Sequence, residues 1–216
     1  MHAVTPDFLV VAESAIDLVG RVEVAQRWSQ PSALPLMSVG ALAAHLGQQV
    51  QMVHAAVTGG QSVTDDAPVA LLEHYARASW VDGDLDSDAN VDIRAGAEQA
   101  ALVGHDPLVR ALEDQMRDLR RAFGRSSFRR PPGIRLPSWS WALTFEDFVL
   151  TRVMELVVHS DDLAVSVDVD AHPLPESVLG PVLALLVGVS LHRHGQAAVV
   201  RALTRRERAP GSISAF

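Results

Sequence analysis

Polar side chains gather on one narrow stripe of an otherwise apolar helical segment that runs from Thr144 to Val167. At about 100° per residue, these polar positions fall within an arc of roughly 100°, and aliphatic residues cover most of the remaining surface. A polar arc usually means a solvent-exposed face, but charges confined to so narrow a strip favour a groove that faces a cleft. The stripe consists of Thr151, Arg152, Glu155, His159, Asp162 and Ser166.

The same helical periodicity predicts further helices along the chain. Thr5 is expected to cap the first helix, and Ser38 a second one that ends near Thr58. Thr144 and Asp147 resemble a capping box at the start of the striped helix. The other expected helices cover 68–80, 91–103, 108–123 and 176–208, the last with a break near Gly195.

No run of alternating apolar and polar residues predicts a strand of useful length. We therefore expect an all-α fold, built as a helical bundle. With 216 residues and 48% hydrophobic composition, the chain can bury a core as one domain. Residues 1–168 are expected to form the bundle, and residues 169–216 a C-terminal helical extension packed on the same domain.

The composition excludes several kinds of site. The chain has no cysteine, so it offers no disulfide bond, thiolate ligand or thiol nucleophile, and any sulfur chemistry needs a small-molecule thiol. A net charge of −8 argues against binding to a phosphate backbone. The longest apolar stretch, 181–191, is shorter than the about 20 residues that span a bilayer, and no signal peptide is recognisable, so we expect a cytoplasmic protein.

A carboxylate and an imidazole stand four residues apart on the polar stripe. This spacing places Glu155 and His159 about 5–6 Å apart on one face, which lets both reach a single metal ion. His45 is the candidate third ligand if it faces the pair across the bundle, and a core-edge histidine bonded to a backbone carbonyl is the alternative. The remaining histidines are expected at the surface: His2, His54, His74, His105, His172, His192 and His194.

Two motifs carry a resemblance to a known family. WSQPS at 28–32 leads into LAAHL at 42–46, and TRVMELVVHSDDL occupies 151–163. Together they resemble the mycothiol-dependent maleylpyruvate isomerase N-terminal domain, which belongs to the DinB-like metal-binding four-helix bundles. The resemblance spans roughly 5–168 and implies a DinB-like four-helix bundle with an appended C-terminal helical segment. It also implies a divalent metal, usually Zn2+, held by His45, Glu155 and His159.

The resemblance implies a chemistry as well. Two imidazoles and one carboxylate leave a zinc coordination position open for water or substrate, as in catalytic sites. In the family the metal binds the sulfur of mycothiol and lowers its pKa. We therefore expect an enzyme that uses this thiol for S-transfer or thiol-assisted isomerisation of an electrophilic substrate, as a monomer or homodimer without nucleic acid or membrane partners. A metal-activated-water hydrolase or a non-enzymatic metal-binding interaction bundle are the alternatives.

Other polar residues are candidates for supporting roles. Arg152 is expected to pair with Glu155 or Asp162, and binding of an anionic substrate is its alternative role. Asp162, one turn after His159, is a candidate for fixing the orientation of a ligand. Three arginines in the proline-rich segment 124–140 are candidates for binding polar groups of the thiol, or else are solvated loop charges: Arg129, Arg130 and Arg135.

The chain departs from the family pattern in the segment before His45. Family members commonly have a tryptophan and an acidic residue there, where this chain has LMSVGA at 36–41. Full-length isomerases also carry a second, C-terminal domain, for which residues 173–216 are too few. The metal ligands are retained but the substrate pocket is expected to differ, so we do not assign maleylpyruvate as substrate.

Overall fold

The protein is built from α-helices. The computed structural model describes residues 4–59, 63–82 and 84–216. In these ranges, extended pairing is limited to isolated bridges such as that between Ile134 and Leu143, which confirms the predicted all-α fold. The helices are α1 (Val4–Val19), α2 (Val22–Gln26), α3 (Val39–Val57), α4 (Leu71–Arg77), α5 (Ser79–Asp82), α6 (Asp88–Ala101), α7 (His105–Phe123), α8 (Phe145–Ser166) and α9 (Glu176–Thr204), with a 3-10 turn, η1 (Arg206–Arg208).

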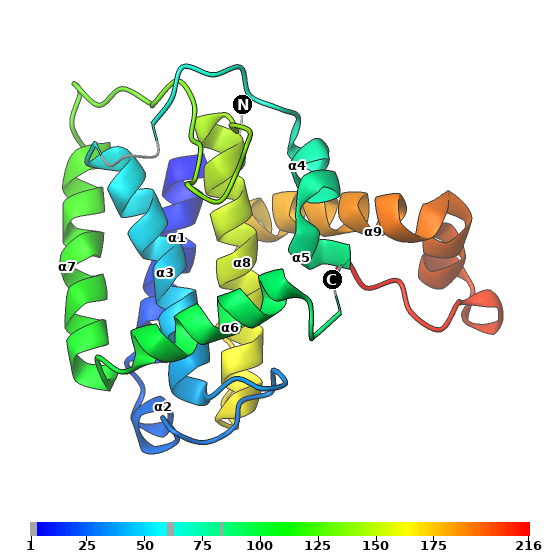
Figure 1. The fold of residues 1–216 in the computed structure, drawn as a ribbon, viewed down its shortest axis with the longest axis horizontal. Coiled ribbons are helices and arrows are strands. Elements are labelled where there is room, and N and C mark those ends of the chain that lie inside the picture. Colours follow the sequence, from blue (N-terminus) through cyan, green and yellow to red (C-terminus); the bar gives the residue numbers. More distant parts are fainter. Residues whose placement is uncertain (1–3, 60–62, 83) are drawn as a thin grey trace.

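Four long helices form the body of the molecule. In Figure 1, α1, α3, α7 and α8 run alongside one another, α6 crosses in front of α3, and α9 extends away from the body. The apolar faces of the four helices meet in the core, where burial of apolar surface supplies the main stabilising free energy. Each helix contributes a fully buried side chain to it, for example Phe8, Leu42, Leu112 and Phe148.

The two helices that carry the candidate ligands begin at the predicted caps. Ser38 Oγ accepts a hydrogen bond of 3.0 Å from the backbone N–H of Ala41, and Thr144 Oγ1 accepts one of 3.0 Å from Asp147. Each bond satisfies an N–H group that has no partner inside the helix. Ser38 also binds Glu98 of α6 through its backbone N–H, at 2.7 Å, and its hydroxyl, at 3.0 Å. Ser38, the cap of α3, thereby holds α6 against the start of α3.

Several helix boundaries differ from the predictions. The predicted cap at Thr5 is wrong, because the first helix already includes that residue, and this helix ends at Val19, with Gly20 and Arg21 between it and α2. The predicted helix over 68–80 is interrupted by the extended backbone of Ala78, which divides α4 from α5. The predicted break near Gly195 is confirmed, because this residue has a φ of 77° that glycine adopts readily.

Helix α9 differs from the bundle helices in its exposure. It contacts α8 and α4, but only 28% of its most apolar stretch of 18 residues is buried. Of the helices in the described ranges, it alone is long and apolar enough to cross a membrane by length and composition. One helix that passes this test is weak evidence for a membrane span.

Candidate metal centre

Three side chains from two helices converge inside the bundle. His45 comes from α3, whereas Glu155 and His159 come from α8, where a spacing of four places both on one face. One ligand atom from each residue lies within 4.8 Å of the other two. The rings of His45 and His159 meet edge to face with centroids 4.8 Å apart, and His159 Nε2 lies 3.1 Å from Glu155 Oε2.

This donor set fits a divalent metal ion. In a tetrahedral zinc site the ligand atoms lie about 2.0–2.2 Å from the ion, and therefore about 3.4 Å from one another. The donor atoms of His45, Glu155 and His159 lie within 4.8 Å of one another, and Nε2 of His159 is 3.1 Å from Oε2 of Glu155. Nitrogen and oxygen donors of this kind suit zinc, and three of them leave a fourth position open.

Asp162 lies one turn beyond His159 on α8. Its Oδ2 atom is 3.0 Å from Nδ1 of His159, while Nε2 of the same ring faces Glu155. A carboxylate at Nδ1 fixes the orientation of the ring and leaves Nε2 available to a metal. Asp162 thus occupies the position that its predicted orienting role requires.

Burial and mutual charge shift the protonation of the three candidate ligands. Burial, together with the charge of His159, lowers the pKa of His45 to about 4. Burial acts to lower the pKa of His159 too, but hydrogen bonds to Asp162 and Glu155 outweigh it and raise that pKa to about 9. Burial acts to raise the pKa of Glu155, but the hydrogen bond and charge of His159 prevail and lower it to about 2. Glu155 is therefore a carboxylate at neutral pH, and it favours a cation beside it.

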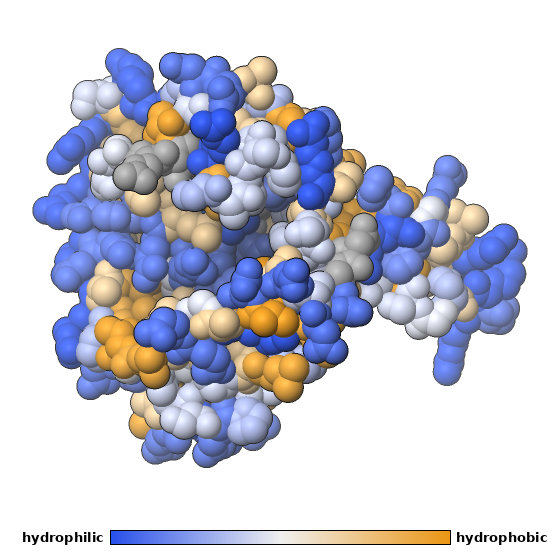
Figure 2. All heavy atoms as spheres, in the orientation of Figure 1, coloured by the Kyte–Doolittle hydropathy of each residue, from blue (hydrophilic) through white to orange (hydrophobic). Residues whose placement is uncertain are grey.

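The candidate ligands line a cavity of about 1410 Å³ between α3, α6 and α8. The surface is hollowed beside α6 on the face drawn in Figure 2, where apolar patches interrupt a mostly hydrophilic surface. The polar stripe on α8 therefore faces a cleft, as its narrowness predicts. Other parts of the chain complete the wall with aromatic side chains: His74, Trp80, Trp139 and Phe216.

Arg152 is buried in the same wall, and only 6% of it is exposed. Its Nη1 donates a 2.6 Å hydrogen bond to Oε1 of Gln49 on α3, and its Nε donates one of 3.0 Å to Oγ1 of Thr151. The predicted direct ion pair with Glu155 or Asp162 is not formed in the described part of the chain, where both carboxylates bind His159, but the charge of Arg152 acts on Glu155 and helps to lower the pKa of that carboxyl. The hydrogen-bond acceptors of Arg152 are neutral, and its positive charge lies at the cavity wall, where it interacts with the carboxylate of Glu155.

A comparison with protein families decides what kind of bundle this is. The family described as Mycothiol maleylpyruvate isomerase N-terminal domain matches residues 10–164, a range that includes all three candidate ligands. The chain belongs to this family. Its fold is accordingly the DinB-like bundle of the mycothiol maleylpyruvate isomerase N-terminal domain, and membership indicates a mycothiol-related, isomerase-like function. Neither the curated proteins nor the solved structures provide a match.

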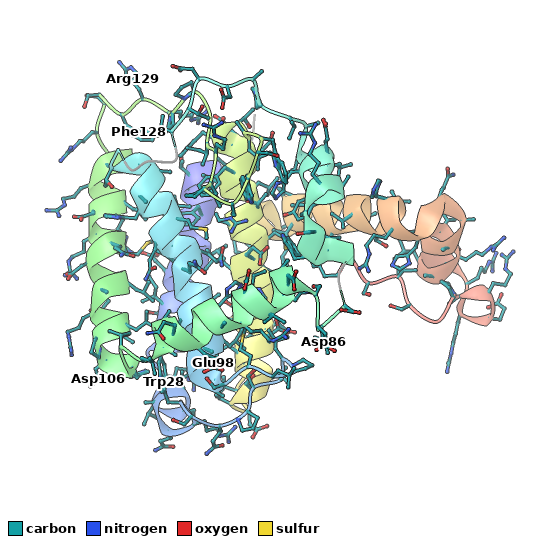
Figure 3. The ribbon with its side chains drawn as sticks, viewed as in Figure 1. Trp28, Asp86, Glu98, Asp106, Phe128 and Arg129 are labelled. Atoms are coloured by element: carbon teal, nitrogen blue, oxygen red, sulfur yellow. The ribbon has the colours of Figure 1, made fainter. Side chains whose placement is uncertain are left out.

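The three arginines predicted to bind mycothiol do not line the cavity that contains the candidate metal ligands. Arg130 and Arg135 form ion pairs of 2.6 and 2.8 Å with Glu146 and Asp66. Arg129 donates to two nearby backbone carbonyls and points outward at the top of Figure 3. Local partners hold all three at exposed positions, so the structure does not bring them to the site. Other residues of the same segment do border the cavity: Leu136, Ser138 and Trp139.

His74 is the site residue that sequence reasoning misses. The sequence predicts a surface histidine, yet only 1% of His74 is exposed. This residue lines the cavity that contains the candidate metal ligands, and it accepts a 3.0 Å hydrogen bond from Nε1 of Trp141. No local signal marks it, because α4 is short and the segment that covers it follows much later in the chain. His105 is also partly buried and bonds to the Val19 carbonyl at 2.8 Å, and His2 lies outside the described residues.

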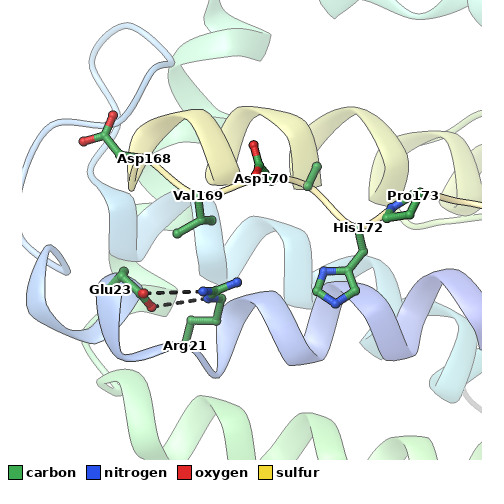
Figure 4. Close-up of a pocket in the computed structure, with 8 residues that line it drawn as sticks. Arg21, Glu23, Asp168, Val169, Asp170, His172 and Pro173 are labelled. Carbon is green, nitrogen blue, oxygen red and sulfur yellow. Dashed lines mark hydrogen bonds and ion pairs between the residues drawn. The ribbon is translucent and has the colours of Figure 1, made fainter.

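A second hollow of about 810 Å³ lies between the start of α2 and the segment that follows α8 (Figure 4). Its wall includes Arg21, Glu23 and residues 168–173. Arg21 and Glu23 pair with each other at 3.3 Å, so their charges are mutually compensated. This hollow shares no lining residue with the cavity that contains the candidate metal ligands, so it is separate from the candidate metal centre.

Proposed function

We propose that this chain is a metal-dependent enzyme that uses mycothiol for S-transfer or thiol-assisted isomerisation of a small electrophile. The observation that carries the proposal is the convergence of His45, Glu155 and His159 at the wall of a large cavity. A divalent ion held by these residues would lower the pKa of a thiol and supply a thiolate at neutral pH. The chain has no cysteine, so the sulfur must come from a small molecule.

The size of the cavity supports a reaction between two ligands. At about 1410 Å³ it exceeds the roughly 300–1,000 Å³ of pockets that hold one drug-sized ligand. The cavity therefore has room for a thiol at the metal ligands and for an electrophile beside the thiol. Holding both reactants in one cavity converts their encounter into an effectively intramolecular step.

Residues around the candidate ligands have roles that follow from their contacts. Asp162 holds the ring of His159 so that Nε2 points to the ligand cluster. Arg152, held by Gln49, keeps a positive charge at the wall for an anionic group of the electrophile. This second role is the alternative that the sequence leaves open for Arg152, and its neutral hydrogen-bond partners, Gln49 and Thr151, support it.

Metal analysis followed by thiol titration tests the proposal. Protein purified without added metal or chelator, and then reconstituted with zinc, is expected to hold one divalent ion per chain. In a calorimeter, mycothiol is expected to bind the zinc-loaded protein and not the metal-free protein. Zinc content near zero after reconstitution would refute the metalloenzyme. Full zinc content without binding of mycothiol would instead favour hydrolysis by metal-activated water.

A further inference from the structure

Helix α9 is apolar on both of its sides. The buried residues of its first part recur at helical spacing on one side: Val178, Val182, Leu185 and Val189. Exposed residues that are apolar or small form an apolar stripe on the opposite side: Gly180, Leu183, Ala184, Val187 and Leu191. At about 100° per residue, the positions of this stripe fall within an arc of roughly 100°. The solvent face of a surface helix is usually polar, so the apolar stripe needs an explanation.

The apolar stripe is long and uncharged. Leu183 is 56% exposed, and Val187 and Leu191 are 37% and 38% exposed. No charged residue occurs from Ser177 to Leu191, which corresponds to about four turns of helix. Single apolar residues are common on protein surfaces, whereas a continuous exposed apolar patch marks a surface that binds a partner.

Charges of opposite sign flank the apolar stripe. The residues just before it are acidic: Asp168, Asp170 and Glu176. The segment after it is basic apart from Glu207, and its arginines are Arg193, Arg201, Arg205, Arg206 and Arg208. A second copy of α9 that runs antiparallel to the first brings the acidic end of each helix to the basic end of the other. Two-fold symmetry satisfies both ends at once, and the stripe meets itself in the middle.

A lipid bilayer is the other apolar partner to consider, and two observations argue against it. The opposite side of α9 is buried in the protein, so the helix could cross a bilayer only by leaving the bundle. The net charge of −8 provides no attraction to an anionic membrane surface. A second copy of the chain matches both the apolar stripe and its flanking charges, and therefore fits better.

We propose that the chain forms a homodimer in which α9 pairs antiparallel with α9 of a second copy. The two-fold axis lies beside Ala184, the middle of the uncharged stretch. The small residues Gly180 and Ala184 let the two helices approach closely, and Leu183 and Val187 pack across the axis. Val187 also lines the cavity of the candidate metal ligands, so the second copy lies at an edge of that cavity. The proposal does not depend on the metal or on the proposed reaction.

Sedimentation equilibrium over a range of micromolar concentrations tests the dimer. The unsubstituted protein is expected to reach twice the mass of one chain. Leu183→Glu places a charge in the apolar interface and is expected to weaken dimerisation by about a hundredfold or more. Leu102→Glu is the matched control, because Leu102 is 75% exposed at the end of α6, and it is expected to dimerise normally. A monomeric unsubstituted protein, or a Leu183→Glu protein that dimerises normally, would overturn the proposal.

Cysteine cross-linking tests the antiparallel arrangement. The chain has no cysteine, so a single introduced cysteine reports where two copies meet. Ala184→Cys lies beside the proposed axis and is expected to form a disulfide-linked dimer under mild oxidation. Leu191→Cys is the control: at about 1.5 Å per residue its two copies lie roughly 20 Å apart along the helices, beyond the about 7 Å that a disulfide spans. Equal cross-linking at both positions, or none at Ala184→Cys, would contradict the antiparallel pair.

Phosphatidylcholine vesicles test the alternative partner. The dimer is expected to remain in solution when the vesicles are sedimented. A protein that is monomeric without vesicles and sediments with them would show that the apolar stripe binds lipid, and it would overturn the homodimer.

Discussion

At the scale of single residues, His159 connects more of the candidate centre than any other side chain described above. Its two ring nitrogens lie 3.1 Å from Glu155 and 3.0 Å from Asp162, and its ring contacts that of His45. One nitrogen is thus oriented by a carboxylate, and the other faces the remaining ligands. Loss of this ring removes a ligand and also the group that orients the cluster.

His159→Ala is therefore expected to abolish tight zinc binding. The loss should exceed the about 10- to 100-fold decrease that follows removal of an outer-shell partner, because a ligand itself is lost. His192→Ala is the control, since His192 is exposed on α9 and belongs to no group of candidate ligands in the described residues. Zinc titration against a competing chelator measures both affinities. Equal loss in the two variants would show that the wrong histidine is assigned.

His74 is expected to make stability depend on pH. Its pKa of about 4 in the folded protein lies below the ordinary value of 6.5. Between these values the unfolded chain binds a proton that the folded chain does not, so the free energy of unfolding decreases as pH falls from 6.5 towards 4. His45, whose pKa is also lowered to about 4, acts in the same direction.

Urea denaturation of the metal-free protein at pH 7 and pH 5 measures this effect. We expect a lower free energy of unfolding at pH 5, and a smaller difference between the two pH values for His74→Phe than for the unsubstituted protein. The same pH difference in both proteins would contradict a buried, neutral His74.

At the scale of helices, the start of α3 depends on close packing between Gly40 and Trp28. A Cβ atom at Gly40 would lie 2.6 Å from Cε2 of Trp28, so the indole would have to move. That movement would also break the 3.3 Å hydrogen bond from Trp28 Nε1 to the Ala101 carbonyl at the end of α6. Gly40 thus lets the turn after α2 pack between the start of α3 and the end of α6.

Gly40→Ala is expected to lower the free energy of unfolding by about 1–3 kcal/mol, the usual cost of overpacking. Gly96→Ala in α6 is the matched control, because a Cβ there meets no atom within 4 Å. It is expected to stabilise the protein by roughly 0.5–1 kcal/mol, since alanine favours the helix over glycine. Chemical denaturation measures both, and an unaltered Gly40→Ala protein would contradict the close packing.

The helix scale also explains what the sequence predicts and what it does not. Caps and ligand spacing are local properties, so Ser38, Thr144 and the Glu155–His159 pair are readable from neighbouring residues. Hydrogen-bond partners from distant segments cannot be read from neighbouring residues in this way. Arg152 is an example, because its acceptor Gln49 lies 103 residues earlier in the chain. His74 is missed for the same reason, because its burial depends on how the segment around Trp139 crosses α4.

At the scale of the whole molecule, a metal ion would tie together two of the four bundle helices. The candidate ligands come from α3 and α8, which also pack against each other and against other helices of the bundle. A ligand that binds only the folded state stabilises it according to its free concentration. Zinc at about 100 times its dissociation constant is therefore expected to raise the free energy of unfolding by about 2.7 kcal/mol.

Urea denaturation with and without zinc measures this stabilisation. His159→Ala protein is the control and is expected to gain little from the same zinc concentration. If zinc stabilises both proteins equally, it acts at another position and not at the cluster of His45, Glu155 and His159.

The most direct test of the central claim is the absorption spectrum of cobalt-substituted protein with mycothiol. In the proposed function, the three ligands leave one coordination position for the sulfur of a small thiol. Addition of mycothiol is then expected to produce a sulfur-to-cobalt charge-transfer band in the near ultraviolet, and His159→Ala protein should not show it. Normal cobalt occupancy without such a band would contradict thiolate coordination and favour metal-activated water.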